Sequence, residues 1–101
     1  MSRPLVSVVI PVYNEEESLP LLFDRLMPVM ESLGRPYEVV FINDGSRDRS
    51  LALLLDCRKR FPGRVTVIDF NGNFGQHMAI MAGFSQAGGE MVLTMDADLQ
   101  N

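Results

Sequence analysis

The chain has 101 residues, of which 13 are acidic, nine are basic and 47% are hydrophobic, as is typical of one small globular domain at most. Its formal charge of −4 argues against a nucleic-acid-binding surface, and no apolar run approaches the roughly 18 residues that span a membrane. The single cysteine, Cys57, excludes an internal disulfide framework and a multi-cysteine zinc site, and it favours a reducing, cytoplasmic location.

Four short apolar runs, rich in Val and Ile, alternate with longer periodic segments. Such continuous runs predict strands that are covered on both faces, as in a parallel sheet. The four predicted strands are Leu5–Val12, Tyr37–Ile42, Val65–Phe70 and Met91–Met95.

The first segment between these strands, Ser18–Leu33, has the apolar spacing of a helix with one buried face. Pro20 suits the first turn of this helix, because a helix leaves its first N–H groups without internal partners. We expect Pro28 to kink or shorten the helix, and Gly34 to end it in the left-handed conformation.

Two further helices are predicted, over about Asp48–Phe61 and about Gln76–Gln86, the latter weakened by the internal Gly83. One side of the earlier helix is predicted to carry Leu51, Leu54, Leu55 and the aliphatic stem of Arg58. With right-handed crossovers, this β-α-β-α-β-α-β order predicts an α/β fold with a doubly wound, mostly parallel, Rossmann-like sheet and helices on both faces. No element follows the last predicted strand, so we expect an open sheet edge there.

Polar or acidic residues follow every predicted strand. In open α/β sheets, ligands bind beyond the carboxyl ends of the strands, near the point where the strand order reverses. The four strand ends are residues 11–15 (PVYNE), 43–46 (NDGS), 71–76 (NGNFGQ) and 96–100 (DADLQ). Their coincidence predicts a ligand site at this edge of the sheet.

Asp96 and Asp98 directly follow the last predicted strand. On an extended chain, residues two apart point to the same side, about 6.6–6.8 Å from each other. Two such carboxylates repel each other unless a cation lies between or beside them, and Mg²⁺ takes one or two carboxylates together with phosphate oxygens and water. The pair therefore indicates a metal–diphosphate site; the alternative is a solvated acidic turn.

Asp44 and Tyr13 each have two interpretations. Asp44, before Gly45 and Ser46, could be a turn or helix-capping residue. Its carboxylate could instead accept a hydrogen bond from a ribose hydroxyl or a ligand N–H such as the imide of uracil. Tyr13 could stack on a base or simply pack against its neighbours.

Together these motifs resemble family 2 glycosyltransferases of the GT-A fold, in which they occur in the same order. The motifs are residues 8–15 (VVIPVYNE), 43–46 (NDGS), Asn73-x-Gly75 and 96–98 (DAD). Within that family, residues 73–84 (NFGQHMAIMAGF) and 96–101 (DADLQN) are most similar to the polyprenyl-phosphate sugar transferases.

The resemblance implies an inverting, metal-dependent transferase of cell-envelope and lipopolysaccharide biosynthesis. Its donor would be a nucleotide sugar, expected to be a UDP-sugar, and its acceptor an undecaprenyl-type polyprenyl phosphate. The resemblance also implies that Pro11, Tyr13 and Glu15 line the nucleoside pocket and that Asp44 reads the base.

The same resemblance implies a divalent cation, Mg²⁺ or Mn²⁺, with Asp98 as its chief ligand. Asp96 would lie by the ribose and diphosphate, and Gln100 would help to hold the metal. One residue departs from the pattern, because Gly72 stands where many relatives carry an arginine that would contact the diphosphate or the fold.

Residues 1–101 resemble only the donor-binding part of a GT-A domain. We therefore expect the catalytic and acceptor-binding residues to lie beyond residue 101. On this interpretation the chain alone binds donor nucleotide and catalyses little, and the full-length protein works at the cytoplasmic face of the membrane.

Two alternatives belong to other classes of protein. The first is a non-catalytic nucleotide-binding module, or one that forms a homo-oligomer through its open sheet edge. The second is a phosphotransfer receiver or phosphohydrolase, which also places Asp residues at strand ends. Those folds need a Lys or Thr partner after a later strand, whereas Lys59, the only lysine, is predicted to lie within a helix.

Overall fold

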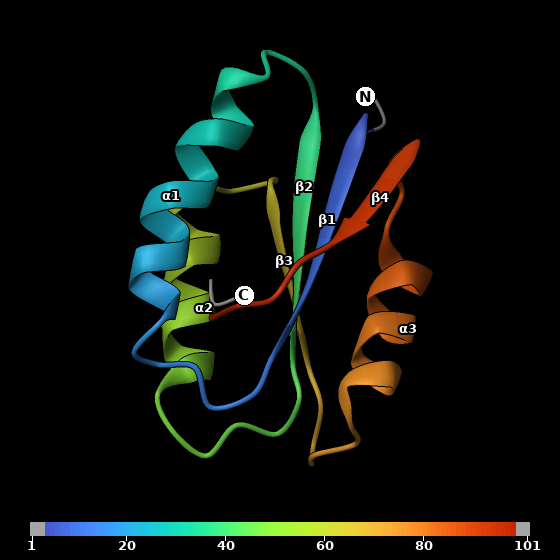
Figure 1. The fold of residues 1–101 in the computed structure, drawn as a ribbon. Coiled ribbons are helices and arrows are strands. Elements are labelled where there is room, and N and C mark those ends of the chain that lie inside the picture. The colour runs from blue at the N-terminus through green and yellow to red at the C-terminus, as the bar shows by residue number, and fades with distance from the viewer. Residues whose placement is uncertain (1–3, 99–101) are drawn as a thin grey trace.

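A computed structural model describes residues 4–98 as four strands and three helices that alternate along the chain (Figure 1). The strands are β1 (Val6–Val12), β2 (Tyr37–Asn43), β3 (Val65–Asp69) and β4 (Met91–Thr94). The helices are α1 (Leu19–Ser32), α2 (Ser50–Arg60) and α3 (Gln76–Gln86). The predicted order of elements is thus confirmed.

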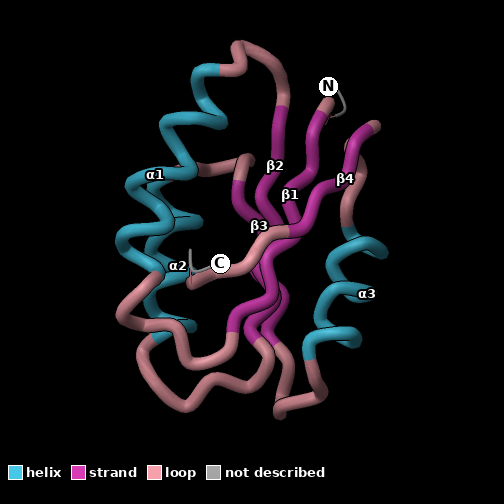
Figure 2. The backbone as a smooth tube through the Cα atoms, in the orientation of Figure 1, coloured by secondary structure: helices cyan, strands magenta, loops and turns pink. Residues whose placement is uncertain are grey.

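The four strands form one parallel sheet in the order β3-β2-β1-β4. Val6 is paired with Tyr37 of β2 on one side and with Met91 of β4 on the other, so β1 lies between β2 and β4 in the sheet. Helices α1 and α2 cover one face of the sheet and α3 covers the other, as Figures 1 and 2 show. The chain moves outward from β1 to β3 and then returns to β4, so the strand order reverses between β1 and β4.

The two faces of β1 contribute to two separate parts of the core. Val8 and Ile10 belong to the larger cluster, which includes apolar side chains of α1 and α2, whereas Val9 belongs to a smaller cluster with Ala79 of α3. This alternation confirms the prediction of doubly covered strands for β1 and β2. The prediction is wrong for β4, in which every residue is exposed. Composition cannot show whether a helix lies over a strand, and α3 packs on β1 and β2 instead.

Helix α1 continues past Pro28 to Ser32, so the shortening that the sequence offered as one of two effects of this proline does not occur. Pro28 lies on the exposed side, while Met27 and Met30 on either side of it are buried in the core. Tertiary packing on the buried face outweighs the local cost of the proline. Gly34 has a φ of +62°, as predicted for a left-handed residue after the helix.

The buried side of α2 also differs from the prediction, because it is formed by Ser50, Leu54 and Cys57. Arg58 is exposed, together with the following basic residues of the last turn, where positive charge complements the helix dipole. Cys57 is fully buried, and this burial raises the pKa of its thiol to about 11.

Gly83 allows α3 to lie directly on the sheet. A Cβ at this position would collide with the side chains of Val9 and Ile42. Gly83 lowers the intrinsic helix propensity of α3, but it has a packing role, since the absence of a side chain lets α3 lie close to β1 and β2.

A polar cluster at the amino end of the sheet fixes the connection between α3 and β4. The Ser7 hydroxyl donates to Glu38 Oε2 (2.5 Å), and the same oxygen accepts the Gly88 N–H (2.7 Å). The Gly89 N–H in turn donates to Ser7 Oγ (2.8 Å). These bonds join the connection to both β1 and β2, and so help to set the position of β4.

Candidate functional site

An open cleft of about 460 Å³ lies at the carboxyl ends of the strands, a volume within the usual range of small-molecule sites. The lining residues come from all four strand ends: Pro11, Val12, Tyr13, Glu15, Asp44, Asn73, Gly75, Gln76, Asp96, Ala97 and Asp98. This set includes all predicted site residues except Gln100, which lies outside the described residues. The cleft spans the point where the strand order reverses, as the topology rule predicts.

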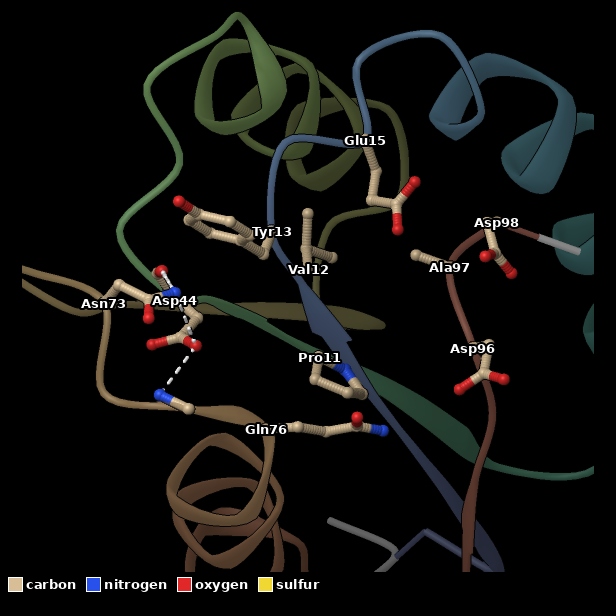
Figure 3. Close-up of a pocket in the computed structure, with 11 residues that line it drawn as sticks. Pro11, Val12, Tyr13, Glu15, Asp44, Asn73, Gln76, Asp96, Ala97 and Asp98 are labelled. Atoms are coloured by element: carbon tan, nitrogen blue, oxygen red, sulfur yellow. Dashed lines mark hydrogen bonds between the residues drawn. The ribbon is translucent and has the colours of Figure 1, made fainter.

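The cleft has two chemically different ends, which Figure 3 shows. Asp44, Asn73 and Tyr13 lie together at one end. Asp96 and Asp98 lie at the other end, on the segment that follows β4. The arrangement offers a ring and hydrogen-bonding groups at one end and acidic oxygens at the other.

Asp44 is 4% exposed, and its carboxylate holds the loop that leads into α3. Its Oδ1 accepts the Phe74 N–H (2.7 Å), and its Oδ2 accepts the Gly75 N–H (3.0 Å) and the Asn73 side-chain amide (3.1 Å). Asn73 also donates to the Asp44 carbonyl oxygen (3.1 Å). Asp44 thus has a structural role, namely holding the loop before α3. From the sequence, a structural role and a ligand-binding role were alternatives, but the structure allows Asp44 to have both.

The turn after β1 presents two neighbouring side chains to the cleft. Asn14 has a φ of +53°, a left-handed conformation that asparagine tolerates better than most residues. Tyr13 and Glu15, on either side of it, both line the cleft, and Tyr13 is 47% exposed. A ring with this exposure is accessible to a ligand.

Asp96 and Asp98 line the cleft. The chain between them was predicted to be extended, but in the structure it is not. Ala97 and Asp98 form a turn, and the strand ends earlier, at Thr94. The side chain of Ala97 is buried (2% exposed) and belongs to the larger core cluster. This small buried residue anchors the turn between the two carboxylates.

The cleft concentrates negative charge around Glu15. Burial raises the pKa of the Glu15 carboxyl, and the charges of Asp98, Asp48 and Asp96 raise it further, against a hydrogen bond with Ser18 that lowers it. A divalent cation would relieve this repulsion, so the donor set fits a metal that also binds phosphate oxygens. Among residues 4–98, no group of three or more His, Cys, Asp or Glu is placed to hold a metal by itself.

The raised pKa of Glu15 predicts that replacing its carboxyl group by a neutral amide stabilises the fold in a pH-dependent way. The folded state binds the proton of the Glu15 carboxyl group more tightly than the unfolded state does. The free energy of unfolding is therefore higher at low pH, where this group is protonated, and it falls as the pH rises through the raised pKa. We expect Glu15→Gln to increase the free energy of unfolding at about pH 7 and to have no such effect at about pH 3.5. Urea unfolding at both values tests this, with the exposed Glu90→Gln as control; an equal effect at both pH values would contradict it.

Sequence reasoning did not assign roles to Asn73 and Gln76, which line the same cleft. Their signal was their position directly after the third strand, but residues 71–76 match neither the G-x-G-x-x-G pattern nor the phosphate-binding P-loop. The partner of Asn73 is Asp44, 29 residues earlier, and a contact this distant cannot be deduced from local spacing.

Comparison with known proteins decides the family. The model of the family described as "Glycosyl transferase family 2" matches residues 7–101. The chain belongs to glycosyl transferase family 2. The resemblance to family 2 glycosyltransferases inferred from the sequence is therefore confirmed.

Curated relatives in this family are undecaprenyl-phosphate 4-deoxy-4-formamido-L-arabinose transferases. The one from Pectobacterium atrosepticum is 52% identical over 96 residues, which cover 95% of this chain and 29% of the relative. The one from Pseudomonas paraeruginosa is 56% identical over 97 residues, which cover 96% of this chain and 29% of the relative. The chain thus spans less than a third of the length of these relatives.

Solved structures of other transferases share the fold. S. aureus TarS (residues 1–349) in complex with UDP-GlcNAc matches with a TM-score of 0.75 and 28% identity, covering 92% of this chain and 26% of that one. A mannosyltransferase from Pyrobaculum calidifontis in complex with GDP-Man and Mn²⁺ matches with a TM-score of 0.71 and 26% identity, covering 96% and 28%. Across residues 4–98, none of the helices is long and apolar enough to cross a membrane.

Proposed function

We propose that this chain is the donor-binding part of an inverting, metal-dependent family 2 glycosyltransferase. Its donor is a UDP-sugar, and its acceptor is an undecaprenyl-type polyprenyl phosphate. The observation that carries the proposal is that one cleft brings together polar groups from all four strand ends at the point where the strand order reverses. The names of the curated relatives and the UDP-GlcNAc complex of TarS support it.

The end of the cleft formed by Tyr13 and Asp44 is assigned to the base. Pro11 and Glu15 complete the nucleoside pocket, and the exposed ring of Tyr13 stacks on the base. A carboxylate has about four lone-pair positions, and Asp44 uses three of them for the loop before α3. The remaining position accepts the imide N–H of uracil, which cytosine does not have.

The opposite end, formed by Asp96 and Asp98, is assigned to the ribose and the diphosphate. Asp98 is the chief ligand of a divalent cation, with Asp96 beside it and Gln100, outside the described residues, as a further ligand. When bound, the cation supplies the Lewis-acid chemistry that neutralises the departing nucleoside diphosphate. Without a cation between them, the negatively charged diphosphate and the acidic end of the cleft would repel each other.

The acceptor side of the reaction is proposed to lie outside this chain. A lipid phosphate is already ionised at neutral pH, so it needs little help from a general base to attack the sugar. Because the acceptor is a membrane lipid, the whole protein is assigned to the membrane surface, on the cytoplasmic face. The isolated chain is then expected to bind the donor nucleotide without transferring its sugar.

Calorimetric titration of the chain with UDP, in the presence and absence of Mn²⁺, tests the proposed function. We expect UDP binding that requires Mn²⁺ and that CDP and ADP do not match, because only the uracil ring offers the imide N–H to Asp44. Equal binding of the three nucleotides would contradict the assignment of the base. A folded chain that binds none of them would overturn the proposal for these residues.

A second, compatible candidate is self-association through β4. This strand lies at the edge of the described sheet, and Met91, Val92 and Leu93 are 54%, 39% and 50% exposed. An exposed apolar edge strand is a template for pairing with another chain. We expect light scattering after size exclusion to show a concentration-dependent dimer that Val92→Lys removes, whereas the control Thr66→Lys, at an exposed position on the β3 edge, leaves it. A monomer at all concentrations would contradict this candidate.

A further inference from the structure

The loop that follows β1 and the loop between β2 and α2 are joined by hydrogen bonds from backbone to side chain. Three consecutive N–H groups of the first loop donate to two side chains of the second loop and to the side chain of Ser50, the first residue of α2. The bonds are Asn14 N–H to Ser46 Oγ (2.9 Å), Glu15 N–H to Ser50 Oγ (2.8 Å) and Glu16 N–H to Asp48 Oδ2 (3.1 Å). We call Ser46, Asp48 and Ser50 the loop clasp.

The first loop also holds the second. Arg47 N–H donates to Asn14 Oδ1 (2.8 Å), and Arg49 N–H donates to Glu16 Oε1 (2.8 Å). The two loops therefore exchange bonds in both directions, so a shift of one loop would break bonds at several points. Such a doubly satisfied network fixes a single loop conformation.

Two members of the loop clasp are well suited to hold the loop firmly. The Ser50 side chain is fully buried, so an unpaired partner N–H beside it would have no easy access to water. Asp48 accepts two bonds, one on each oxygen, because its Oδ1 takes the Ser50 N–H (2.8 Å) while its Oδ2 takes the Glu16 N–H. These hydrogen bonds outweigh burial and lower the pKa of Asp48, so the group is an ionised acceptor at neutral pH.

The loop clasp acts at a distance from the ligand, since none of its three residues lines the cleft. Of the three residues whose N–H groups it binds, Glu15 lines the cleft, and Tyr13, which also lines the cleft, directly precedes the left-handed Asn14. Both hydrogen-bonding groups of Asn14 named above, its N–H and its side-chain oxygen, are bound by the second loop. An unusual backbone conformation of this kind persists only where the surroundings hold it in place.

We propose that Ser46, Asp48 and Ser50 are positioning residues for the nucleotide, which hold Tyr13 and Glu15 in their binding orientation before the ligand arrives. This inference rests on the proposed function, because it assumes that a nucleotide occupies the cleft. Pre-ordering the loop lowers the conformational cost of binding, so its loss reduces affinity without removing any ligand contact.

The substitution Asp48→Asn tests the inference with little change in shape. The single amide oxygen of asparagine can accept only one of the two N–H groups that face the two oxygens of Asp48. We expect faster amide exchange at Glu15 and Glu16, followed by NMR, and UDP binding in Mn²⁺ that is about tenfold weaker, as for the loss of one charge-assisted hydrogen bond. The control is Asp56→Asn, the same change at an exposed position of α2, which should alter neither.

Urea unfolding of both variants separates positioning from a loss of folded protein. An unfolding midpoint near that of the control, with weaker UDP binding, supports the positioning role. Faster exchange with unchanged UDP affinity overturns it, and so does unchanged exchange. If Asp48→Asn is unfolded, Ser46→Ala, which removes only the acceptor of the Asn14 N–H, is judged by amide exchange at Asn14 and by UDP binding. A wild-type chain that binds no UDP would instead overturn the proposed function on which the inference rests.

Discussion

Replacement of Asp98 by Asn is expected to remove the Mn²⁺-dependent part of UDP binding. The neutral amide keeps the size of the side chain but loses the charge that a divalent cation seeks, at the end of the cleft assigned to the diphosphate. We expect the affinity for UDP in Mn²⁺ to fall on the order of 100-fold or more, since changes to groups that merely support a metal ligand already cost about 10- to 100-fold. Calorimetry with and without Mn²⁺ measures the difference.

The matched control for Asp98→Asn is Asp24→Asn, an identical change at an exposed position of α1 outside the cleft. Asp98 also interacts with other groups of the protein, so the unfolding midpoint of each variant is measured beside the affinity. A folded Asp98→Asn variant that still binds UDP in a Mn²⁺-dependent manner would show that the metal assignment is wrong.

The order of the elements was predictable because it depends on local patterns, and the open α/β class then follows from chain connectivity. What the sequence could not show was which helix covers which strand. The run Met91–Thr94 resembles the buried run of β1 in composition, yet it is exposed, because α3 packs on β1 and β2. The continuation of α1 past Pro28 was not predictable for the same reason, since the packing of Met27 and Met30 is a tertiary effect.

The place of the cleft was predictable for a different reason, namely that parallel strands deliver all their carboxyl ends to one edge of the sheet. The polar residues after each strand could therefore be brought together without knowledge of their geometry. The internal bonds of the site could not, because Asp44 bonds residues 29 to 31 positions away and the loop clasp bonds residues 32 to 35 positions away. These contacts give the loops after β1, β2 and β3 their shape, and they are visible only once the strands are in register.

Gly45 shows how closely this shape is constrained, and Gly45→Ala is expected to be among the most destabilising single changes in the site. Its φ is +74°, and a Cβ there would lie 2.5 Å from Asn73 N and 2.7 Å from Gly72 O, with the carbonyl carbon of Gly72 nearer still. These are backbone atoms, so they can give way only if the whole loop before α3 moves. That movement would pull the N–H groups of Phe74 and Gly75 away from the Asp44 carboxylate.

The expected cost of Gly45→Ala is about 2–5 kcal/mol, because about 1–2 kcal/mol for the left-handed backbone adds to about 1–3 kcal/mol for the collision. Gly63→Ala is the matched control, because Gly63 has a similar φ of +79° and nothing lies within 4 Å of its added Cβ. Urea unfolding should therefore show a loss of only about 1 kcal/mol for the control, with unchanged UDP affinity. The difference between the two variants measures the contact between the loops, and equal losses would mean that the approach of Gly45 to residues 72–73 contributes nothing to the site.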